Sequence, residues 1–478
     1  MNSIMNHGFV SPYFLFNFAG GSIDTVPPRY FMNFHQDRSV NCAASFELTL
    51  VYVAGTLGDT TASNMHQMLL SSVDQPVYYQ YGYRTPGGGV TTQDQAYTGI
   101  FTQYVEDINE GYLTYKICGV AHAVPIIEPR VNVESYINDL KKEGGMIQPS
   151  QIVETLILED KGSGISELLR GFEIDIEKTD KMVDVTSINV KNGPLAEVLN
   201  GKKNADGTGL PGGLVSYSVA PIEYNTSIKS LASAYDTLVS HGASSSVTTS
   251  MSEAKNKMVN QAEQPFVCYY DNVIGKIGSS GKGSFHYVPK QRRQITNQFI
   301  YNFGNNFIDS DVLSFNVSVD DIVAMANKNS ANSTSCSIDV NGNLIGSNYN
   351  EAKASDFTRN TYNTLSGFDE SSWMTIGMLA DTLNFSYSAT MTVVGQIECN
   401  KLLDKITVNV FVNGVPHVGL TGDYIIMGIT EDLSDSGFTT TFELQRAVES
   451  ISLENDLVAT PGNGQAADDA KNLVDDYK

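Results

Sequence analysis

The sequence contains a few groups of residues whose types and spacing approach those of known chemical sites. The segment Gly278–Ser284 has the glycines and the lysine of a phosphate-binding loop. Such a loop needs a glycine five residues before the Gly–Lys step and a Ser or Thr after the lysine. No glycine lies five residues before Gly281, and Gly283 follows Lys282. The segment therefore predicts a glycine-rich turn between two strands.

Three polar residues have the spacing of the first ligands of a calcium loop: Asp339, Asn341 and Asn343. Leu344 occupies the position that requires glycine, and Asn350 the position that requires glutamate. We therefore predict a hairpin at the Asn341–Gly342 step. A second acidic group favours a solvated turn over a cation site; it comprises Glu431, Asp432 and Asp435.

The other reactive side chains are scattered. The seven histidines form no HExxH or HxH pattern, and the five cysteines form no CxxC pattern. These residues are His7, His35, His66, His122, His241, His286 and His417, with Cys42, Cys118, Cys268, Cys336 and Cys399. We expect His286 to be an ordinary hydrogen-bonded residue, and Cys42 and Cys268 to be inert thiols in apolar strands. GxSxG is absent, so we predict no enzyme, no catalytic residue, no metal and no cofactor.

Charge and hydropathy exclude two further classes of protein, those that bind nucleic acid specifically and those that span a membrane with an apolar helix. The formal net charge is −23, and the one basic cluster, Lys290–Arg293, is short. Specific nucleic-acid binding needs clustered Lys and Arg, so we do not expect it. No apolar run approaches the roughly 18 residues of a membrane span. The first residues lack the basic start of a signal peptide, so we expect synthesis in the cytoplasm.

Most of the chain reads as β-structure. Residues 1–125 contain apolar residues at every second position, which predicts strands with one face toward a core. These residues are Phe14, Phe16 and Phe18, then Phe46, Leu48, Leu50 and Tyr52, and then Leu113, Tyr115 and Ile117. We assign residues 1–125 to an N-terminal tube-like β-barrel domain.

Residues 126–310 change character and predict an α+β middle domain. Pro149 begins a predicted helix, a second helix is predicted from Thr226 or Ser227, and strand signals return at 266–315. Residues 311–450 predict a second tube-like β-barrel with an Asn/Ser-rich insertion at 326–372. Its four strand-like runs lie between 391 and 446. Residues 451–478 predict an acidic flexible tail.

Several of these segments, taken in order, resemble bacteriophage tail baseplate hub proteins. The last strand pair runs Gly422-Asp423-Tyr424-Ile425-Ile426 and Gly437-Phe438-Thr439-Thr440-Thr441-Phe442-Glu443-Leu444. Further pieces are Ser45–Thr49, Tyr81–Tyr83, Tyr97–Gly99, Phe266–Val273, Gly283–Pro289 and Asp311–Asn316. The resemblance covers about residues 40–446, but neither the insertion nor the first 25 residues or so.

The resemblance implies a virion protein of the tail baseplate. It implies a homotrimer in which each chain contributes two barrels, so that a pseudo-sixfold ring joins a hexameric tail tube to a threefold spike and lets DNA pass. The implied partners are the tail tube protein, the central spike protein, baseplate wedge or adaptor proteins and the tape measure protein. The expected ring and interface strands carry Phe46, Leu48, Tyr424, Gly437, Phe438, Thr440 and Phe442.

Two alternatives remain open. The first is a host-surface-binding component of a tail tip, such as an adhesin of a phage or phage-like injection particle. The second is a peptidoglycan hydrolase, which the absence of a motif makes the weaker alternative. The fold predicted in each case is mainly β, with two antiparallel β-barrels linked by an α+β region.

Overall fold

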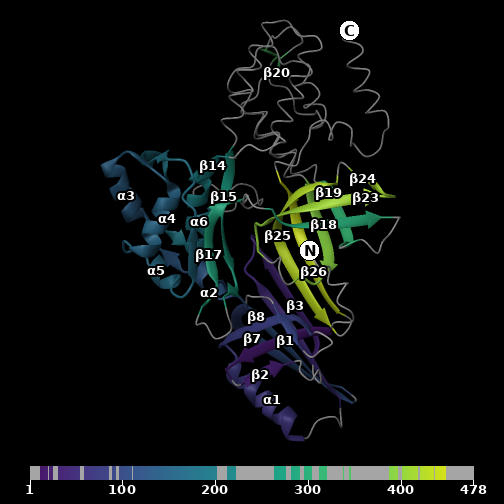
Figure 1. Cartoon of the computed structure of the whole chain (residues 1–478). Helices are drawn as coiled ribbons and strands as arrows, with labels where there is room; N and C mark the ends of the chain where they lie inside the picture. The colour runs from purple at the N-terminus through teal and green to yellow at the C-terminus, as the bar shows by residue number, and fades with distance from the viewer. Residues whose placement is uncertain are drawn as a thin grey trace, which may run out of the picture.

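The computed structural model is mainly β with an α+β middle region, as the sequence predicts (Figure 1). It describes residues 11–19, 21–24, 31–53, 59–84, 89–92, 96–109, 111–201, 213–221, 263–275, 281–290, 295–303, 310, 312–319, 337–338, 344–345, 387–396, 401–417, 420–434 and 437–447. The helix predicted from Thr226 or Ser227, most of the insertion at 326–372 and the tail at 451–478 lie outside these residues.

The N-terminal region consists of strands and one helix. Its elements are β1 (Ser11–Phe18), β2 (Gly21–Asp24), β3 (Phe31–Ser39), β4 (Ser45–Val53), α1 (Asp59–Ser72), β5 (Pro76–Arg84), β6 (Val90–Thr92), β7 (Ala96–Asn109) and β8 (Tyr112–Val120). The predicted alternation is confirmed on β4, where Phe46, Leu48 and Leu50 are buried. Helix α1 was not predicted from the sequence, because it presents only a short apolar stripe, with Met65 and Leu69 four residues apart.

The N-terminal strands curl around one aromatic core. The strand order is β3-β4-β8-β7-β5-β1-β2, so β1 and β3 lie far apart along the sheet. Nevertheless, the ring centroids of Phe14 on β1 and Phe34 on β3 are only 4.5 Å apart. The sheet therefore bends until its two sides meet across the core, as expected of a half-barrel.

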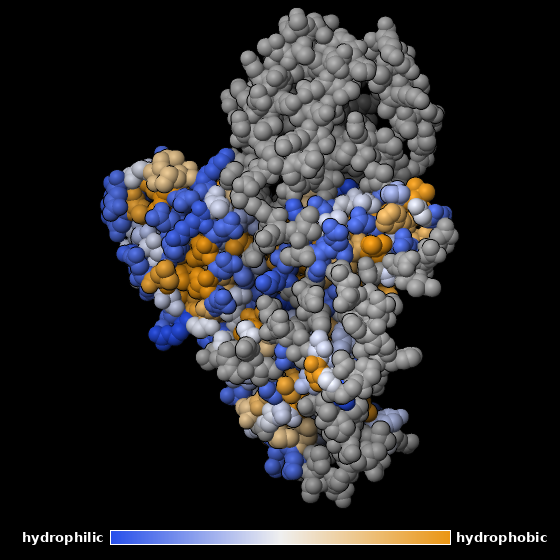
Figure 2. Space-filling model, in the orientation of Figure 1, coloured by the Kyte–Doolittle hydropathy of each residue, from blue (hydrophilic) through white to orange (hydrophobic). Residues whose placement is uncertain are grey.

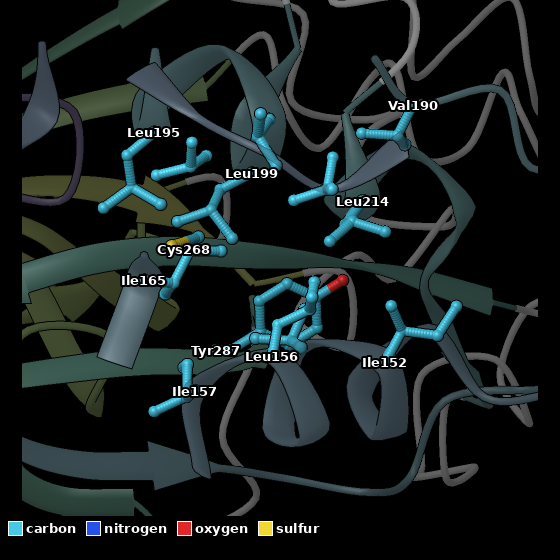
Figure 3. Close-up of a cluster of buried hydrophobic side chains, with 14 of the residues drawn as sticks. Ile152, Leu156, Ile157, Ile165, Val190, Leu195, Leu199, Leu214, Cys268 and Tyr287 are labelled. Carbon is cyan, nitrogen blue, oxygen red and sulfur yellow. The ribbon is translucent and has the colours of Figure 1, made fainter. Parts of the chain in front are cut away.

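The middle region packs its helices on a small sheet. Its elements are α2 (Val124–Ile127), β9 (Arg130–Val131), α3 (Glu134–Glu143), β10 (Met146–Ile147), α4 (Pro149–Leu158), α5 (Ile165–Leu168), β11 (Glu173–Ile176), β12 (Val183–Asp184), η2 (Val185–Ser187), β13 (Gly193–Pro194), α6 (Leu195–Asn200), η3 (Leu214–Tyr217), β14 (Val219–Pro221), β15 (Glu263–Asp271), β16 (Val273–Ile274) and β17 (Ser284–Pro289). The helix predicted from Pro149 is confirmed as α4, with Ile152 and Leu156 buried. Figure 3 shows both side chains in the apolar cluster that also contains Tyr287.

The C-terminal region forms a second curled sheet. Its elements are β18 (Ile295–Phe303), β19 (Val312–Val319), β20 (Ser337–Ile338), β21 (Leu344–Ile345), β22 (Tyr387–Val394), β23 (Lys405–Val412), β24 (Val415–Pro416), β25 (Gly422–Ser434) and β26 (Gly437–Arg446). Strands β20 and β21 pair antiparallel, so the predicted hairpin is present, but Ile338 lies opposite Leu344, a register that differs from that of a two-residue turn at Asn341–Gly342. The four runs predicted between 391 and 446 correspond to β22, β23, β25 and β26.

The ends of this C-terminal sheet also approach each other. The pairing order is β18-β23-β25-β26-β22-β19. The Ser310 hydroxyl oxygen lies 3.3 Å from the carbonyl oxygen of Ile300 on β18 and 2.9 Å from that of Val312 on β19, so its one hydrogen can be donated to either strand. Phe299 and Phe442 meet across the core at 5.9 Å. Strand β18, which precedes residue 311, therefore packs with the C-terminal strands.

One pairing joins the two curled sheets. Residues Gly428–Ser434 of β25 pair antiparallel with Asn33–Ser39 of β3, so a single 16-stranded sheet runs through both regions. The first half of β25 pairs with β23 in the C-terminal sheet. The two barrels are consequently held by continuous backbone hydrogen bonding along β25. We name this β3–β25 pairing the seam.

Candidate functional site: a buried polar junction at the seam

The inner face of β3 changes from apolar to polar where the three regions meet. Phe34, Gln36 and Arg38 point to the same side because strand side chains alternate, and all three are buried. Phe34 belongs to the aromatic core of the N-terminal barrel. Gln36 and Arg38 instead face the end of β15, which arrives from the middle region. β3 therefore brings a cation into the interior beside the seam.

Arg38 makes the central contact of this junction. Its Nη1 lies 3.1 Å and 3.2 Å from the two carboxylate oxygens of Asp271, at the end of β15. The Arg38 and Asp271 side chains are only 1% and 8% exposed, so the ion pair is almost entirely out of water. The guanidinium also lies 5.0 Å from the ring centroid of Tyr97 on β7, within the range of a cation–π contact.

Asn272 extends the junction toward the N-terminal barrel. Its amide nitrogen donates to the Tyr79 hydroxyl at 2.9 Å, and its side-chain oxygen accepts from Gln36 at 3.5 Å. Its backbone carbonyl accepts from the Thr98 N–H at 2.9 Å. The next residue, Val273, pairs with Tyr97 through β16. Side-chain and backbone bonds thus tie the middle region to β5 and β7.

Glu431 brings a second carboxyl group to the junction from β25, opposite Gln36 in the seam. It is fully buried, and its pKa is raised to about 8. Burial is the largest cause, the charge of Arg38 acts to lower the pKa, and the charge of Asp432 acts to raise it. For Arg38, burial acts to lower the pKa, but Asp271, Tyr97 and Glu431 raise it above its ordinary value. One guanidinium faces two carboxyl groups, and a protonated Glu431 leaves the buried cluster electrically balanced.

The residues expected at ring and interface strands lie inside the chain. Phe46 and Leu48 are buried in the N-terminal core, and Tyr424 and Phe442 in the C-terminal core. Thr440 is fully buried, and its hydroxyl accepts from the Gln396 N–H at 2.9 Å. These side chains support the sheets, and a role of their strands in a ring stays a prediction.

Phe438 connects the two barrels directly. It stands on β26, yet its ring lies 5.5 Å from Tyr81 and 5.4 Å from Tyr83 of β5. The Tyr83 hydroxyl also donates to the carbonyl of Gly395 at 2.9 Å. Gly437 precedes Phe438 with φ +147°, a conformation that favours glycine. The start of β26 therefore closes the N-terminal barrel, although it belongs to the C-terminal strands.

Two expectations about reactive residues are corrected. Glu431 and Asp432 lie on strand β25 and form no turn; Glu431 is buried, while Asp432 pairs with His35 at 2.7 Å. Cys42 lies between β3 and β4 and is exposed, because the apolar pattern stops before it. Cys268 is buried as expected, and burial raises the pKa of its thiol. Residues 339–343, which include the three with the spacing of calcium ligands, lie outside the described residues.

The described part of the chain offers neither a metal site nor a membrane-spanning helix. No group of His, Cys, Asp and Glu there has the geometry to hold a metal ion. Among the same residues, no helix is both long and apolar enough to cross a membrane. The glycine-rich segment ends at β17, which pairs antiparallel with β15 as the predicted turn requires. His286 is hydrogen-bonded through both ring nitrogens.

Apolar side chains reach the surface on both barrels. On the β7–β8 hairpin, Ile108 is 77% and Tyr112 51% exposed, with Val105 beside them on the same hairpin. On the C-terminal barrel, Phe303 and Val415 are 56% and 65% exposed, and both flank Val412. Figure 2 shows apolar residues at the surface over the end that carries β23 and β24. These exposed residues could not be identified from the sequence, because an alternating apolar pattern does not distinguish a core from a contact surface.

No family model and no curated protein sequence matches this chain. Several solved structures are similar. One is the 43 kDa tail protein of prophage MuSo2 from Shewanella oneidensis, with 11% identity and a TM-score of 0.43, covering 92% of this chain and 99% of that chain. Another is the tail protein from Neisseria meningitidis MC58, with 9% identity, a TM-score of 0.42 and coverages of 92% and 99%.

A third similar structure is an E. coli component of the type VI secretion system, whose structure is described as similar to the T4 bacteriophage tail proteins gp27 and gp5. It has 9% identity and a TM-score of 0.35, and covers 91% of this chain and 77% of that chain. These names agree with the family that the sequence resembles. Identities and TM-scores are low, so the role of this chain has to follow from its own residues.

Proposed function

We propose that this chain is the hub subunit of a phage tail baseplate, in which three copies form a ring of six barrels. The observation that carries the proposal is the seam, through which each chain holds two curled sheets side by side. Three copies of such a chain present six barrel edges in threefold symmetry. A sixfold tube and a threefold spike then find matching surfaces on opposite sides of one ring.

The polar junction gives this arrangement rigidity. A ring subunit has to hold its two barrels at a fixed angle, because each barrel must meet a different neighbour. The seam supplies backbone bonds, and the Arg38–Asp271 pair fixes the middle region against them. Phe438 adds apolar packing between the barrels. These contacts come from all three regions, so the chain would enter the ring as one unit.

Exposed apolar residues supply surfaces for assembly. Ile108 and Tyr112 on the N-terminal barrel, and Phe303 and Val415 on the other, are candidates for contacts with neighbouring copies or with the tail tube protein. The resemblance adds a central spike protein, wedge or adaptor proteins and the tape measure protein as partners. The net charge of −23 supports passage of DNA, because an acidic lumen repels the phosphate backbone.

The mass of the purified protein in solution, followed by electron microscopy, tests this proposal. Light scattering should give three times the 52.0 kDa chain mass, and class averages should show a pseudo-sixfold ring. Changing Ile108 to Lys should weaken the trimer, because the charge would be buried in a contact. Changing the exposed surface residue Lys142 to Glu is the matched control and should leave the trimer intact. A monomer at all concentrations that binds neither tube nor spike protein would exclude the hub.

The alternative is a tip component that binds the host surface. It predicts a distal position in the particle and binding to host cells by the isolated protein. Gold labelling of intact particles separates the two, because a hub lies on the tail axis between tube and spike. Label at the far end of fibres would support the adhesin.

A further inference from the structure

The middle sheet holds a hydrogen-bonded serine, histidine and aspartate on one face. Ser284 and His286 are two residues apart on β17, so both side chains point to the same side. Asp175 stands beside His286 in register, on the parallel neighbour β11. The Ser284 Oγ lies 2.8 Å from His286 Nε2, and His286 Nδ1 lies 2.8 Å from Asp175 Oδ2.

The chemistry of the three groups fixes the direction of these bonds. An ionised carboxylate only accepts, so Nδ1 of His286 carries the hydrogen that it donates to Asp175. In the neutral imidazole, Nε2 is then an acceptor, and the Ser284 hydroxyl donates to it. This is the order of roles in a nucleophilic triad: a hydroxyl, a base next to it, and a carboxylate that orients the base.

The surroundings hold the base in place and give it limited access to water. The His286 ring stacks on Tyr269 of β15, with centroids 4.6 Å apart and planes 10° from parallel. Ser284 is 8% exposed, whereas the Asp175 side chain is 44% exposed. Asp271 lies opposite Ser284 on β15, but its charge is balanced by Arg38.

We propose that Ser284, His286 and Asp175 form a nucleophilic site that accepts acyl groups from small activated carboxylic esters. The low exposure of Ser284 restricts the donor to a small molecule. In the reaction, Ser284 Oγ bonds to the carbonyl carbon while His286 Nε2 takes the hydroxyl proton. The bond from that carbon to the leaving alcohol then breaks, and the alcohol oxygen takes the proton. Water repeats the sequence, which releases the acid and restores the serine.

The test uses a fluorophosphonate probe, which forms a covalent bond with activated serines, and the full-length protein. Mass spectrometry of digested protein should find the probe on Ser284, and Ser284→Ala should abolish this labelling. His286→Gln should slow labelling by about 10²-fold or more, the range that a general base supplies. Asp175→Asn should also slow it; since Asp175 is half-exposed, this variant serves if the histidine variant misfolds. Ser318→Ala, which changes an exposed serine on β19, should label like the wild type.

A purely structural network gives a different result. In that case Ser284 takes up no more probe than Ser318, or His286→Gln labels as fast as the wild type while its thermal midpoint falls. Either result overturns the proposal. The hub function does not depend on it, because Ser284→Ala should still form the trimer. A wild-type protein that forms the trimer but takes up no probe at Ser284 contradicts the nucleophilic site alone, whereas a labelled protein that forms no trimer contradicts the hub function alone.

Discussion

Arg38 on β3 and Asp271 on β15 form an almost fully buried ion pair, with Nη1 at 3.1 and 3.2 Å from the two carboxylate oxygens. These residues lie 233 positions apart in the sequence. The pair joins the seam between the barrels to the middle region, and it lies beside Tyr97 and Glu431. The three regions of the chain are therefore coupled at one point.

The first prediction concerns this pair. Asp271→Asn should lower the free energy of unfolding by about 3–5 kcal/mol, because it leaves a buried guanidinium without its counter-charge. Urea denaturation followed by circular dichroism measures the change. Glu47→Gln is the control, since it breaks the exposed pair with Lys116 at 2.8 Å and should change the midpoint little. Equal effects of the two variants would contradict the role of the junction.

The second prediction follows from the buried carboxyl group. Burial raises the pKa of Glu431 from 4.5 to about 8, so the folded state binds a proton that the unfolded state has lost between these pH values. Its contribution to stability is therefore full below about pH 4.5 and falls as the pH rises to 8, by at most about 1.4 kcal/mol per pH unit. Above about pH 8 this contribution of Glu431 is lost, and it no longer changes with pH.

Glu431→Gln isolates this effect. His122 acts in the opposite direction, because burial lowers its pKa to about 4 and stability from this group is lost as the pH falls below 6.5. The wild type and the Glu431→Gln variant both contain His122, so the contribution of His122 cancels in the difference between their urea midpoints. The stability of the variant relative to the wild type should rise between pH 5 and 8. A constant difference over that range would show that Glu431 is ionised throughout.

The third prediction concerns two glycines that make room for one aromatic ring. A Cβ atom on Gly119 would lie 2.1 Å from the Phe46 ring and 2.6 Å from the Ile100 carbonyl, and one on Gly99 would lie 2.8 Å from the same ring. Gly119→Ala should therefore lower the free energy of unfolding of the N-terminal barrel by about 1–3 kcal/mol. Thermal unfolding measures the loss.

Gly275 supplies the matched control for this substitution. It lies after β16 and has open space where a Cβ would stand. Gly275→Ala should therefore unfold at nearly the wild-type temperature. The packing explanation fails if both alanine variants shift the midpoint alike.

The sequence predicts much of the fold because alternation is a local signal. Phe46, Leu48 and Leu50 are on one face of β4 as their spacing requires, and Pro149 begins α4 as its backbone geometry allows. The acidic pair Glu431 and Asp432 misled the prediction, because charge alone suggested a turn. Their alternation within β25 sends one residue inward and the next outward.

The candidate site could not be predicted, since its contacts join distant segments. Nothing near Arg38 in the sequence points to Asp271, and Phe438 offers no local sign that it packs on Tyr81 and Tyr83 of another region. The Ser284–His286 spacing was visible, but Asp175 meets them only through the parallel pairing of β11 and β17. Strand order, which is a property of the whole chain, decides these contacts.

A hub subunit of the proposed kind places its two barrels at adjacent positions of a ring. Cryo-electron microscopy of the purified assembly shows whether they lie there. The map should contain a trimeric ring with six barrels around a channel, in which β3 and β25 of each chain lie at the boundary between its two barrels. A map that shows a single barrel per chain at the ring, or a monomer with the β3–β25 pairing absent, would contradict it.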